Sequence, residues 1–209
     1  MKYKNLKRRV IEISKKHNLS HIGSCLTMID ILAKIYEKKG CRDVVVVSNG
    51  HAGLAQYVCL EAYNGKNADD LYSKHGVHPN YDLADGIYAS TGSLGHGIGI
   101  AVGYALADRT RTVYVTMSDG ELAEGSVYES LQIASAQKLE NLEIHINANG
   151  YGAYRRIYPY KIAEMTCIFG NLDVKIHHTE FEFPFLEGLD AHYMTLNDEQ
   201  YQLALDMTL

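Results

Sequence analysis

Proline is scarce in this sequence, with three prolines among 209 residues, and no internal repeat or linker-like stretch is present. Disordered chains are poor in hydrophobic residues, whereas this chain is 46% hydrophobic and 22% charged. Both features exclude the disordered and low-complexity classes and indicate a globular protein with a sizeable core. Because domains usually contain roughly 100–200 residues, we expect residues 1–209 to form one domain.

An excess of basic residues is also lacking, since 20 lysines and arginines face 25 aspartates and glutamates and the isoelectric point is near 6.0. This balance argues against a dedicated nucleic-acid-binding protein. The longest nearly apolar run, residues 98–107, contains two glycines and is half of the roughly 20 residues that a membrane span needs. The basic N-terminus leads into a helical pattern instead of the apolar segment of a signal peptide. We therefore expect a soluble protein whose partners include neither a nucleic acid nor a membrane.

Paired cysteines are missing too, because Cys25, Cys41, Cys59 and Cys167 form no Cys-x-x-Cys motif in a chain too long for a disulfide miniprotein. We therefore predict free, buried thiols and a reducing compartment, the cytoplasm. The sequence also has no Gly-x-Ser-x-Gly, no Walker sequence and no complete dinucleotide fingerprint, and no zinc spacing occurs among the loop histidines His21, His51, His78 and His96. Serine hydrolase, P-loop and zinc-site chemistry thus have no support.

Hydrophobic periodicity predicts alternating helices and strands over the first 150 residues. Predicted helices cover residues 3–17, 27–40, 52–63, 95–103 and 126–138, and predicted strands cover residues 44–47, 112–117 and 142–147. Residues 74–92 show no clear period, and structureless stretches of this length are usually functional or disordered. After residue 151 the pattern weakens to a short strand near 173–176 and a last helix after Asn197.

Two of the predicted helices carry local signals. Thr27 with Asp30 three positions later resembles a capping box, so we place the start of the second helix there. Gly95, Gly99 and Gly103 lie four residues apart, which would let the backbone of their helix pack closely on a sheet.

The order of the elements predicts the fold class. Strands that alternate with helices imply an α/β fold, a parallel sheet with helices on both faces, in which ligands bind at the carboxyl ends of the strands. Four consecutive valines at 44–47 are typical of a strand buried on both faces, whereas the alternating pattern at 142–146 predicts a less enclosed strand. The polar and glycine-rich loops follow the strands, so a site is expected at that edge of the sheet.

Asp119 and Asn149 each follow a predicted strand and are separated by one strand-helix-strand crossover. This spacing places their side chains next to each other. A hard cation such as Mg²⁺ prefers about six oxygen ligands and is usually held by one or two carboxylates together with ligand phosphates. The alternative is that Asp119-Gly120 and Asn149-Gly150 are simple turns, which such pairs often form.

Other residues also allow two interpretations. The glycine-rich segment 92–99 could receive a phosphate at the start of a helix, or it could only allow close helix packing. Histidines in loops or at helix starts could serve catalysis, or could be capping and surface residues; these are His21, His51, His78 and His96. The acidic group after Asp119 could be a solvated helix face or a carboxylate network at a subunit contact; it comprises Glu121, Glu124 and Glu129.

Taken in order, these segments resemble the N-terminal, diphosphate-binding domain of transketolase, a thiamine diphosphate enzyme. The resemblance covers about residues 6–151 and leaves 152–209 as a divergent C-terminal extension of the same domain. Its pieces are Ser20-His21-Ile22-Gly23, Ser48-Asn49-Gly50-His51-Ala52, His78-Pro79, Thr91-Gly92-Ser93-Leu94-Gly95-His96-Gly97 and Asp119-Gly120-Glu121-Leu122-Ala123-Glu124-Gly125, followed by Asn149. The implied fold is the thiamine diphosphate-binding α/β fold.

The resemblance implies a role for each matching residue. It implies catalytic roles for His21 and His78; cofactor contacts from His51, Gly92, Ser93, Leu94, Gly120, Glu121 and Asn149; Mg²⁺ ligation by Asp119, Asn149 and the carbonyl of Tyr151; and coupling between subunits through Glu124 and Glu129. The sequence departs from the family pattern at Ser93, His96, Ser118 and Asn147-Ala148.

The resemblance also implies partners. In transketolases a glutamate on a second, pyrimidine-binding domain activates the cofactor, and 209 residues leave no room for that domain. We therefore expect the N-terminal subunit of a split transketolase, dependent on thiamine diphosphate and Mg²⁺, that transfers a two-carbon ketol unit between sugars. The C-terminal subunit would be a separate chain, in a heterotetramer or larger assembly. The alternatives are a related decarboxylase or carboligase subunit, and a non-catalytic diphosphate-binding subunit.

The segment after Tyr151 could contact the partner subunit. Arg155 and Tyr158 are of residue types enriched at interface hot spots, although buried aromatic residues serve cores just as often.

Overall fold

The computed structural model describes residues 1–152, 155–179, 182–188 and 192–209. Its centre is a four-stranded parallel sheet with the strand order β1-β2-β3-β4. The strands are β1 (Val44–Val47), β2 (Val113–Ser118), β3 (Leu142–Ala148) and β4 (Asp173–His178). The predicted α/β class with a parallel sheet is confirmed.

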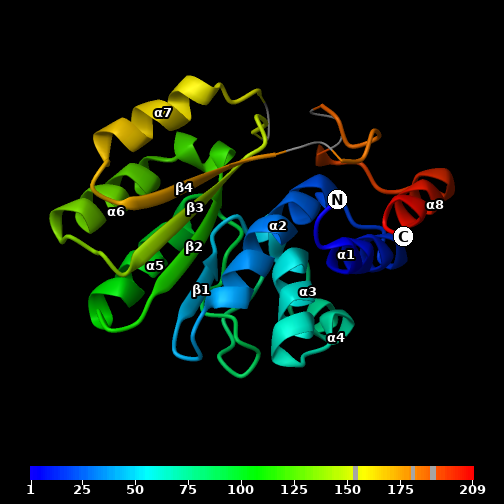
Figure 1. Ribbon diagram of the computed structural model, residues 1–209, viewed down its shortest axis with the longest axis horizontal. Coiled ribbons are helices and arrows are strands. Elements are labelled where there is room, and N and C mark those ends of the chain that lie inside the picture. The colour runs from blue at the N-terminus through cyan, green and yellow to red at the C-terminus, as the bar shows by residue number, and fades with distance from the viewer. Residues whose placement is uncertain (153–154, 180–181, 189–191) are drawn as a thin grey trace.

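Helices cover both faces of the sheet (Figure 1). One group comprises α1 (Lys4–Lys16), α2 (Ile22–Lys38), α3 (Gly53–Asn64) and α4 (Ala68–His75). The other group comprises α5 (His96–Ala107), α6 (Gly125–Ala136) and α7 (Pro159–Ile168), while α8 (Asp198–Met207) packs against α1. Two short 3₁₀ turns, η1 (Gly50–Ala52) and η2 (Asp119–Ala123), follow the ends of β1 and β2.

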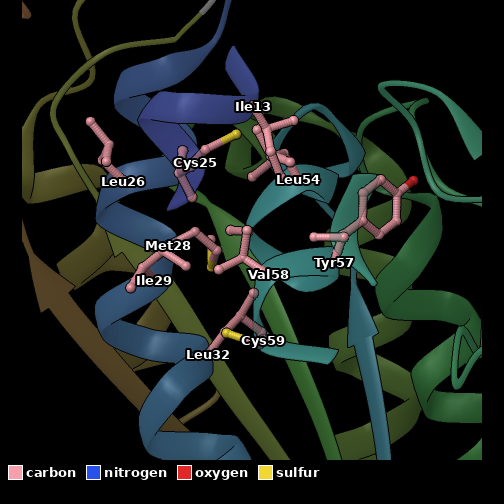
Figure 2. Close-up of a cluster of buried hydrophobic side chains, with 14 of the residues drawn as sticks. Ile13, Cys25, Leu26, Met28, Ile29, Leu32, Leu54, Tyr57, Val58 and Cys59 are labelled. Carbon is pink, nitrogen blue, oxygen red and sulfur yellow. The ribbon is translucent and has the colours of Figure 1, made fainter. Parts of the chain in front are cut away.

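The valines of β1 belong to two hydrophobic cores. Val45 and Val47 join the core formed with α1, α2 and α3, whereas Val44 and Val46 join the core formed with α5 and α6. In the first core, Met28 of α2 lies close to Val58 of α3 (Figure 2). Full burial of a side chain such as valine or methionine stabilises the folded state by about 1.5–3 kcal/mol relative to leaving that side chain in water. The two cores hold the carboxyl ends of the strands at one common edge.

The second helix begins earlier than the sequence pattern predicted. It starts at Ile22, and the Thr27 hydroxyl lies inside it and donates to the carbonyl of Gly23 at 3.0 Å. The expected capping box at Thr27 and Asp30 is therefore wrong. The residue before the helix is His21, whose backbone is left-handed with φ of 60°. Helices α4 and α7 were not predicted either.

The glycine prediction for α5 is wrong in its details. A Cβ atom on Gly97 would lie 2.5 Å from the Cα atom of Ser48 at the end of β1, so Gly97 is the residue that makes the close approach to the sheet. Gly95 and Gly99 instead face Ser126 and Ser130 of α6, and Gly103 has no atom within 4 Å of its Cβ position. Spacing four apart does not identify which glycine faces the sheet.

Two further expectations are corrected by burial. Strand β3 is enclosed along its length, because its polar residues Glu143 and His145 are held in a largely buried network between α2 and β4. Cys25 and Cys59 are buried free thiols, whereas Cys41 and Cys167 are free but exposed. None of the helices in the described residues is long and apolar enough to span a membrane.

Candidate active site

Asp119 and Asn149 lie at the carboxyl ends of the two central strands, β2 and β3. Asp119 is the first residue after β2, and Asn149 is the first residue after β3. The Asp119 Oδ2 atom accepts a hydrogen bond from the backbone N–H of Gly150 at 2.8 Å, which ties the two loops together. The Asn149 Oδ1 atom accepts from the N–H of Tyr151, also at 2.8 Å. The structure therefore brings the three predicted metal-ligating residues into neighbouring turns.

The Asp119 carboxylate is buried, with 1% of the residue exposed. Burial raises its pKa to about 6, although the N–H groups of Gly150 and Gly120 act in the opposite direction. Its second oxygen, Oδ1, is buried and has no hydrogen-bond partner among the described residues. A buried carboxylate oxygen left without a partner is costly unless a ligand satisfies it. The donor set therefore fits a hard cation at Oδ1.

Gly120 leaves room beside this carboxylate. A Cβ atom at Gly120 would lie 3.3 Å from the Cα atom of Gly152 and 3.9 Å from the carbonyl oxygen of Tyr151. Any side chain would therefore crowd the segment that carries the Tyr151 carbonyl. The bare backbone keeps this space open for a ligand group.

The carboxylate of Glu121 is occupied by hydrogen bonds within the protein. Its side chain is fully buried, its Oε1 atom accepts from the Ser48 hydroxyl at 2.6 Å and from the Gly95 N–H at 2.9 Å, and its Oε2 atom accepts from the Ser118 N–H at 3.0 Å. Burial raises its pKa, and these three hydrogen bonds oppose the shift. Glu121 thus joins the ends of β1 and β2 to the start of α5, and its role in cofactor binding stays a prediction.

Three histidines gather beside this edge of the sheet. The ring centroids of His21 and His51 are 5.2 Å apart, those of His21 and His192 are 4.5 Å apart, and those of His51 and His192 are 5.7 Å apart. The backbone N–H of His21 donates to the backbone carbonyl of His192 at 3.1 Å, which holds the left-handed turn before α2 in place. Two of the three residues were predicted, and His192 was missed.

These histidines are neutral in the folded chain. Burial lowers the pKa of His21 to about 4, helped by the nearby His192 and His78. Burial also lowers the pKa of His51 to about 3, with further contributions from His21, His192 and His78. The pKa of His192 is lowered by burial as well. A neutral imidazole accepts a hydrogen bond at one ring nitrogen and donates at the other, so the cluster suits polar groups of a ligand.

Glycines allow the loop over residues 76–95 to pack closely against the turn after β1. A Cβ atom on Gly50 would lie 2.6 Å from the backbone N of Gly92, and one on Gly53 would lie 2.7 Å from Pro79. Gly92 itself has φ of 148°, and its Cβ position lies 3.1 Å from the His78 ring. His78 is exposed on this loop. The packing therefore places His78 and Gly92 next to η1, which carries His51.

The remaining predicted residues lie at the rim. Ser93 is exposed and Leu94 is half-buried, both in the loop that leads into α5. Glu124 and Glu129 are exposed at the start and on the surface of α6. Their roles in cofactor contact and subunit coupling stay predictions.

Four unpaired polar atoms mark the same region. Among the described residues, the buried side-chain atoms without a hydrogen-bond partner include His21 Nδ1, Asn49 Nδ2, Thr91 Oγ1 and Asp119 Oδ1. Each belongs to a segment that forms the site described above. Because buried polar groups are normally paired, this concentration indicates a place where a polar ligand completes the structure.

Acidification is expected to destabilise the chain between about pH 6.5 and pH 3 through His51. Unfolding returns the pKa of His51 from about 3 to its ordinary value of 6.5, so the unfolded state binds more protons in this range and the free energy of unfolding falls as the pH falls. One such group contributes a slope of up to about 1.4 kcal/mol per pH unit. Urea denaturation of His51→Gln should show a flatter pH dependence. The exposed His96→Gln serves as the control, and equal slopes in wild type and His51→Gln would contradict the expectation.

Comparison with known proteins assigns most of the chain to one family. The family described as transketolase, thiamine diphosphate binding domain, matches residues 4–151. The chain belongs to this transketolase family. The predicted resemblance and the thiamine diphosphate-binding fold are confirmed.

Transketolase relatives from bacteria cover about two thirds of the chain. One of the subunits of apulose-4-phosphate transketolase from Phocaeicola vulgatus is 34% identical over 163 residues, which is 68% of this chain and 58% of the relative. The 6-deoxy-6-sulfo-D-fructose transketolase subunit SqwG of Clostridium sp. is 31% identical over 157 residues, or 66% of this chain and 57% of the relative. This chain thus matches a little over half the length of these transketolase subunits.

Solved transketolase structures share the fold over nearly the whole chain. The transketolase from Leishmania mexicana superimposes with a TM-score of 0.81 at 21% identity and covers 98% of this chain and 40% of its own. A transketolase variant from Pichia stipitis gives a TM-score of 0.82 over the same shares at 21% identity. The similarity in fold therefore extends beyond residue 151, where the family match ends.

His192 is the site residue that sequence reasoning missed in this transketolase-family chain. It lies after a segment without clear periodicity, so no pattern connected it with the motifs near the N-terminus. The local signal nearest to it is the Asn197 cap of α8, which marks a helix start and says nothing of a site. Contact between His21 and His192 depends on how the C-terminal segment returns to α1, which local patterns do not contain.

Proposed function

We propose that this chain is the diphosphate-binding subunit of a two-component transketolase that requires thiamine diphosphate and Mg²⁺. The buried Asp119 carboxylate, with one oxygen unpaired beside Asn149, is the observation that carries the proposal. Asp119, Asn149 and the carbonyl of Tyr151 would hold the Mg²⁺ ion, and Gly120 would give the diphosphate room. Bound thiamine diphosphate supplies an electron sink for cleavage of a carbon–carbon bond beside a carbonyl.

The chain's own residues would then handle the diphosphate and the sugar. His51 is half-buried beside His21 and His192, where it would donate a hydrogen bond to a diphosphate oxygen. His21 and His78 would bind substrate hydroxyl groups and transfer protons at their ring nitrogens. Because His21 is held neutral, it can accept a proton at its unpaired Nδ1 atom without first losing one.

A second chain would supply the pyrimidine-binding domain. The names of two relatives describe them as transketolase subunits, which supports a partner for this chain. Helix α5 is strongly apolar, yet Ile100 and Leu106 on it are 37% and 39% exposed. On α6, Ile133 is 49% exposed one turn after Glu129. This surface is a candidate for contact with the partner, with Glu124 and Glu129 at its edge.

The tail after Tyr151 is a second candidate contact. Tyr158 and Tyr160 are 57% and 61% exposed and stack on each other with ring centroids 5.8 Å apart. Arg155 is exposed in the same segment. A heterotetramer of two copies of each subunit, active in the cytoplasm on sugars, completes the proposal.

The test combines the purified chain with a chain that carries a pyrimidine-binding domain. With thiamine diphosphate and Mg²⁺, the mixture is expected to convert a ketose and an aldose into new sugars, whereas either chain alone is silent. Consumption of a 2-oxo acid instead of the ketose would favour the carboligase alternative. Cofactor binding by the complex without any turnover would favour the non-catalytic alternative. Full turnover by this chain alone would exclude the two-component proposal.

A further inference from the structure

The face of the sheet that meets α2 carries a column of polar residues where an apolar surface is usual. Glu143, His145 and Asn147 alternate along β3, and Lys175 and His177 lie beside them on β4. Successive residues of a strand point to opposite faces, so these side chains share one face of the sheet. Contacts to α2 identify that face, since Glu143 pairs with Lys38, and Asn147 donates to the Thr27 hydroxyl at 2.7 Å.

Glu143, at one end of this column, carries an ionised carboxylate. Burial acts to raise the pKa of Glu143, but hydrogen bonds from Lys175, Lys38 and His145 outweigh it and lower the pKa to about 2. The Lys175 Nζ atom lies 2.7 Å from Glu143 Oε2, and Lys38 pairs with Oε1. A carboxylate in this state only accepts hydrogen bonds. The His145 Nε2 atom, 2.6 Å from Glu143 Oε1, must therefore carry a proton.

The proton on His145 Nε2 determines which other ring nitrogens of His145 and His177 carry protons. Burial lowers the pKa of His145, so its ring is neutral and its other nitrogen, Nδ1, is an acceptor. His145 Nδ1 lies 2.9 Å from His177 Nε2, which must donate. The two rings are nearly parallel, with an angle of 10° between their planes. Burial also lowers the pKa of His177 to about 4, so its Nδ1 atom is left as a lone-pair acceptor.

The residue that carries this acceptor, His177, lies at a cavity. His177 lines a cavity of about 500 Å³ between α2, the ends of β3 and β4, and the segment 182–188. No partner of His177 Nδ1 exists in the described residues, and this atom is not among the buried unpaired ones. Lys34 lines the same cavity, lies close enough to His177 to affect its pKa, and forms no ion pair within the described ranges.

The cavity extends from the candidate active site to His177 and Lys34. Asn149 and Tyr151 lie at one end, with Gly23 at the start of α2. Lys34 is 11 residues further along α2, which corresponds to roughly 16 Å at 1.5 Å per residue. Gly23 and Lys34 are therefore too far apart to contact one diphosphate group, while His177, paired with Asn147 on β3, lies between them.

The charged and apolar side chains that line the cavity indicate which kind of ligand fits it. Asp30 and Glu182 also line the cavity, but both are paired with the buried Lys7 at 2.7 Å and 2.5 Å. Because the two carboxylates share one cation, and Lys34 and Lys2 at the rim add two more, these five side chains leave a single net positive charge for a ligand. The Asp30 Oδ1 atom is buried and has no hydrogen-bond partner among the described residues, so it can accept from a ligand hydroxyl. Apolar side chains complete the wall and suit a carbon skeleton; they are Leu26, Ile31, Phe183 and Leu186.

We propose that the far end of this cavity is a second ligand site, which binds a small polyhydroxylated anion. A ligand hydroxyl donates to His177 Nδ1, and the anionic group pairs with Lys34. Glu143 and His145 are positioning residues that keep the accepting nitrogen of His177 turned toward the ligand. The site requires neither the cofactor nor a second subunit, so it stands or falls separately from the proposed function.

The proton positions are tested by nitrogen NMR of the histidine rings in the full chain at pH 7.5. Both His145 and His177 are expected to show protonated Nε2 and unprotonated Nδ1, with assignments from His177→Gln. Gln places a donor where His Nε2 was, so His145 Nδ1 keeps its hydrogen bond in that variant. A doubly protonated His145 would make the cavity-facing atom of His177 a donor and would overturn the proposal.

Ligand binding is tested by calorimetry on the same chain without thiamine diphosphate or Mg²⁺. The probes are D-gluconate, D-ribose 5-phosphate, inorganic phosphate and D-ribose. Binding of gluconate identifies a carboxylate ligand, and binding of ribose 5-phosphate identifies a phosphate ligand. Inorganic phosphate and D-ribose should each bind at least about tenfold more weakly, because each lacks one of the two recognised groups. Equal binding of phosphate, or no binding of any probe, would overturn the proposal.

Variants separate this site from the candidate active site. Lys34→Gln and His177→Gln are each expected to weaken binding by about tenfold or more, since each removes one charged or directed hydrogen bond. Lys39→Gln is the matched control, because Lys39 is a partly exposed lysine just after the same helix and does not line the cavity. Asp119→Asn, which removes the charge of the proposed Mg²⁺ ligand, should bind the probes as wild type does. Equal losses in Lys39→Gln, or a loss in Asp119→Asn, would contradict the second site.

Discussion

Replacing Asp119 with alanine is expected to abolish Mg²⁺-dependent binding of thiamine diphosphate. Asp119 is the only carboxylate of the three proposed ligands, and its buried Oδ1 atom has no hydrogen-bond partner among the described residues. Two opposite unit charges about 4 Å apart interact by roughly 4 kcal/mol at the effective dielectric of a protein surface, which corresponds to about a thousandfold in affinity. Calorimetric titration of thiamine diphosphate and Mg²⁺ into the chain combined with the proposed partner subunit would measure the loss of cofactor binding.

A second substitution separates charge from shape. Asp119→Asn keeps the size of the side chain and can still accept from the Gly150 N–H, but it lacks the negative charge. It is expected to lose cofactor binding as the alanine variant does. Glu140→Gln, at an exposed carboxylate after α6, is the control and should bind normally. Undiminished cofactor affinity in Asp119→Asn would assign Asp119 to the turn alone.

Gly97→Ala is expected to destabilise the fold by about 3 kcal/mol or more. The new Cβ atom would lie 2.5 Å from Ser48 Cα, 2.6 Å from its Cβ atom and 2.7 Å from its Oγ atom, so the backbone of either α5 or β1 has to move. Extra methyl groups in a well-packed interior usually cost about 1–3 kcal/mol, and backbone contacts this short lie at the upper end. Displacing Ser48 also weakens its hydrogen bond to Glu121.

Gly103→Ala on the same helix should have the opposite effect. Apart from the nearby backbone of α5 itself, no atom of the described residues lies within 4 Å of the Cβ position of Gly103, and Gly103 is exposed. Alanine is favoured over glycine inside a helix by about 1 kcal/mol, so this variant is expected to be more stable than wild type. Urea denaturation of both variants measures the difference. A stable Gly97→Ala would show that α5 is not fixed against the end of β1.

Much of the sheet could be predicted from the sequence because burial on both faces leaves a direct mark. The four valines of β1 are apolar since each belongs to one of the two cores. The β3 pattern is different, because Glu143 and His145 are enclosed together with lysines from α2 and β4. A sequence pattern reports polarity and does not report whether polar residues find partners inside the protein. The prediction of a less enclosed strand failed for this reason.

The candidate site could be predicted where its residues follow a strand directly. Asp119 and Asn149 are placed by the ends of β2 and β3, whose positions follow from hydrophobic patterns. His192 is placed by long-range packing, and the start of α2 is placed by the left-handed backbone of His21. Non-glycine residues enter this conformation infrequently, so no local preference predicts it. Such positions are set by the assembled fold.

The hydrogen bond between the His21 N–H and the carbonyl of His192 has a consequence for synthesis on the ribosome. His21 leaves the ribosome early, whereas His192 follows only after the whole sheet has been translated. Nascent chains acquire structure from the N-terminal end as they grow. The turn before α2 would therefore lack this anchor until residue 192 has been translated. The histidine cluster would be complete only when the segment around His192 docks, so tight ligand capture by the cluster would wait until that segment has been made.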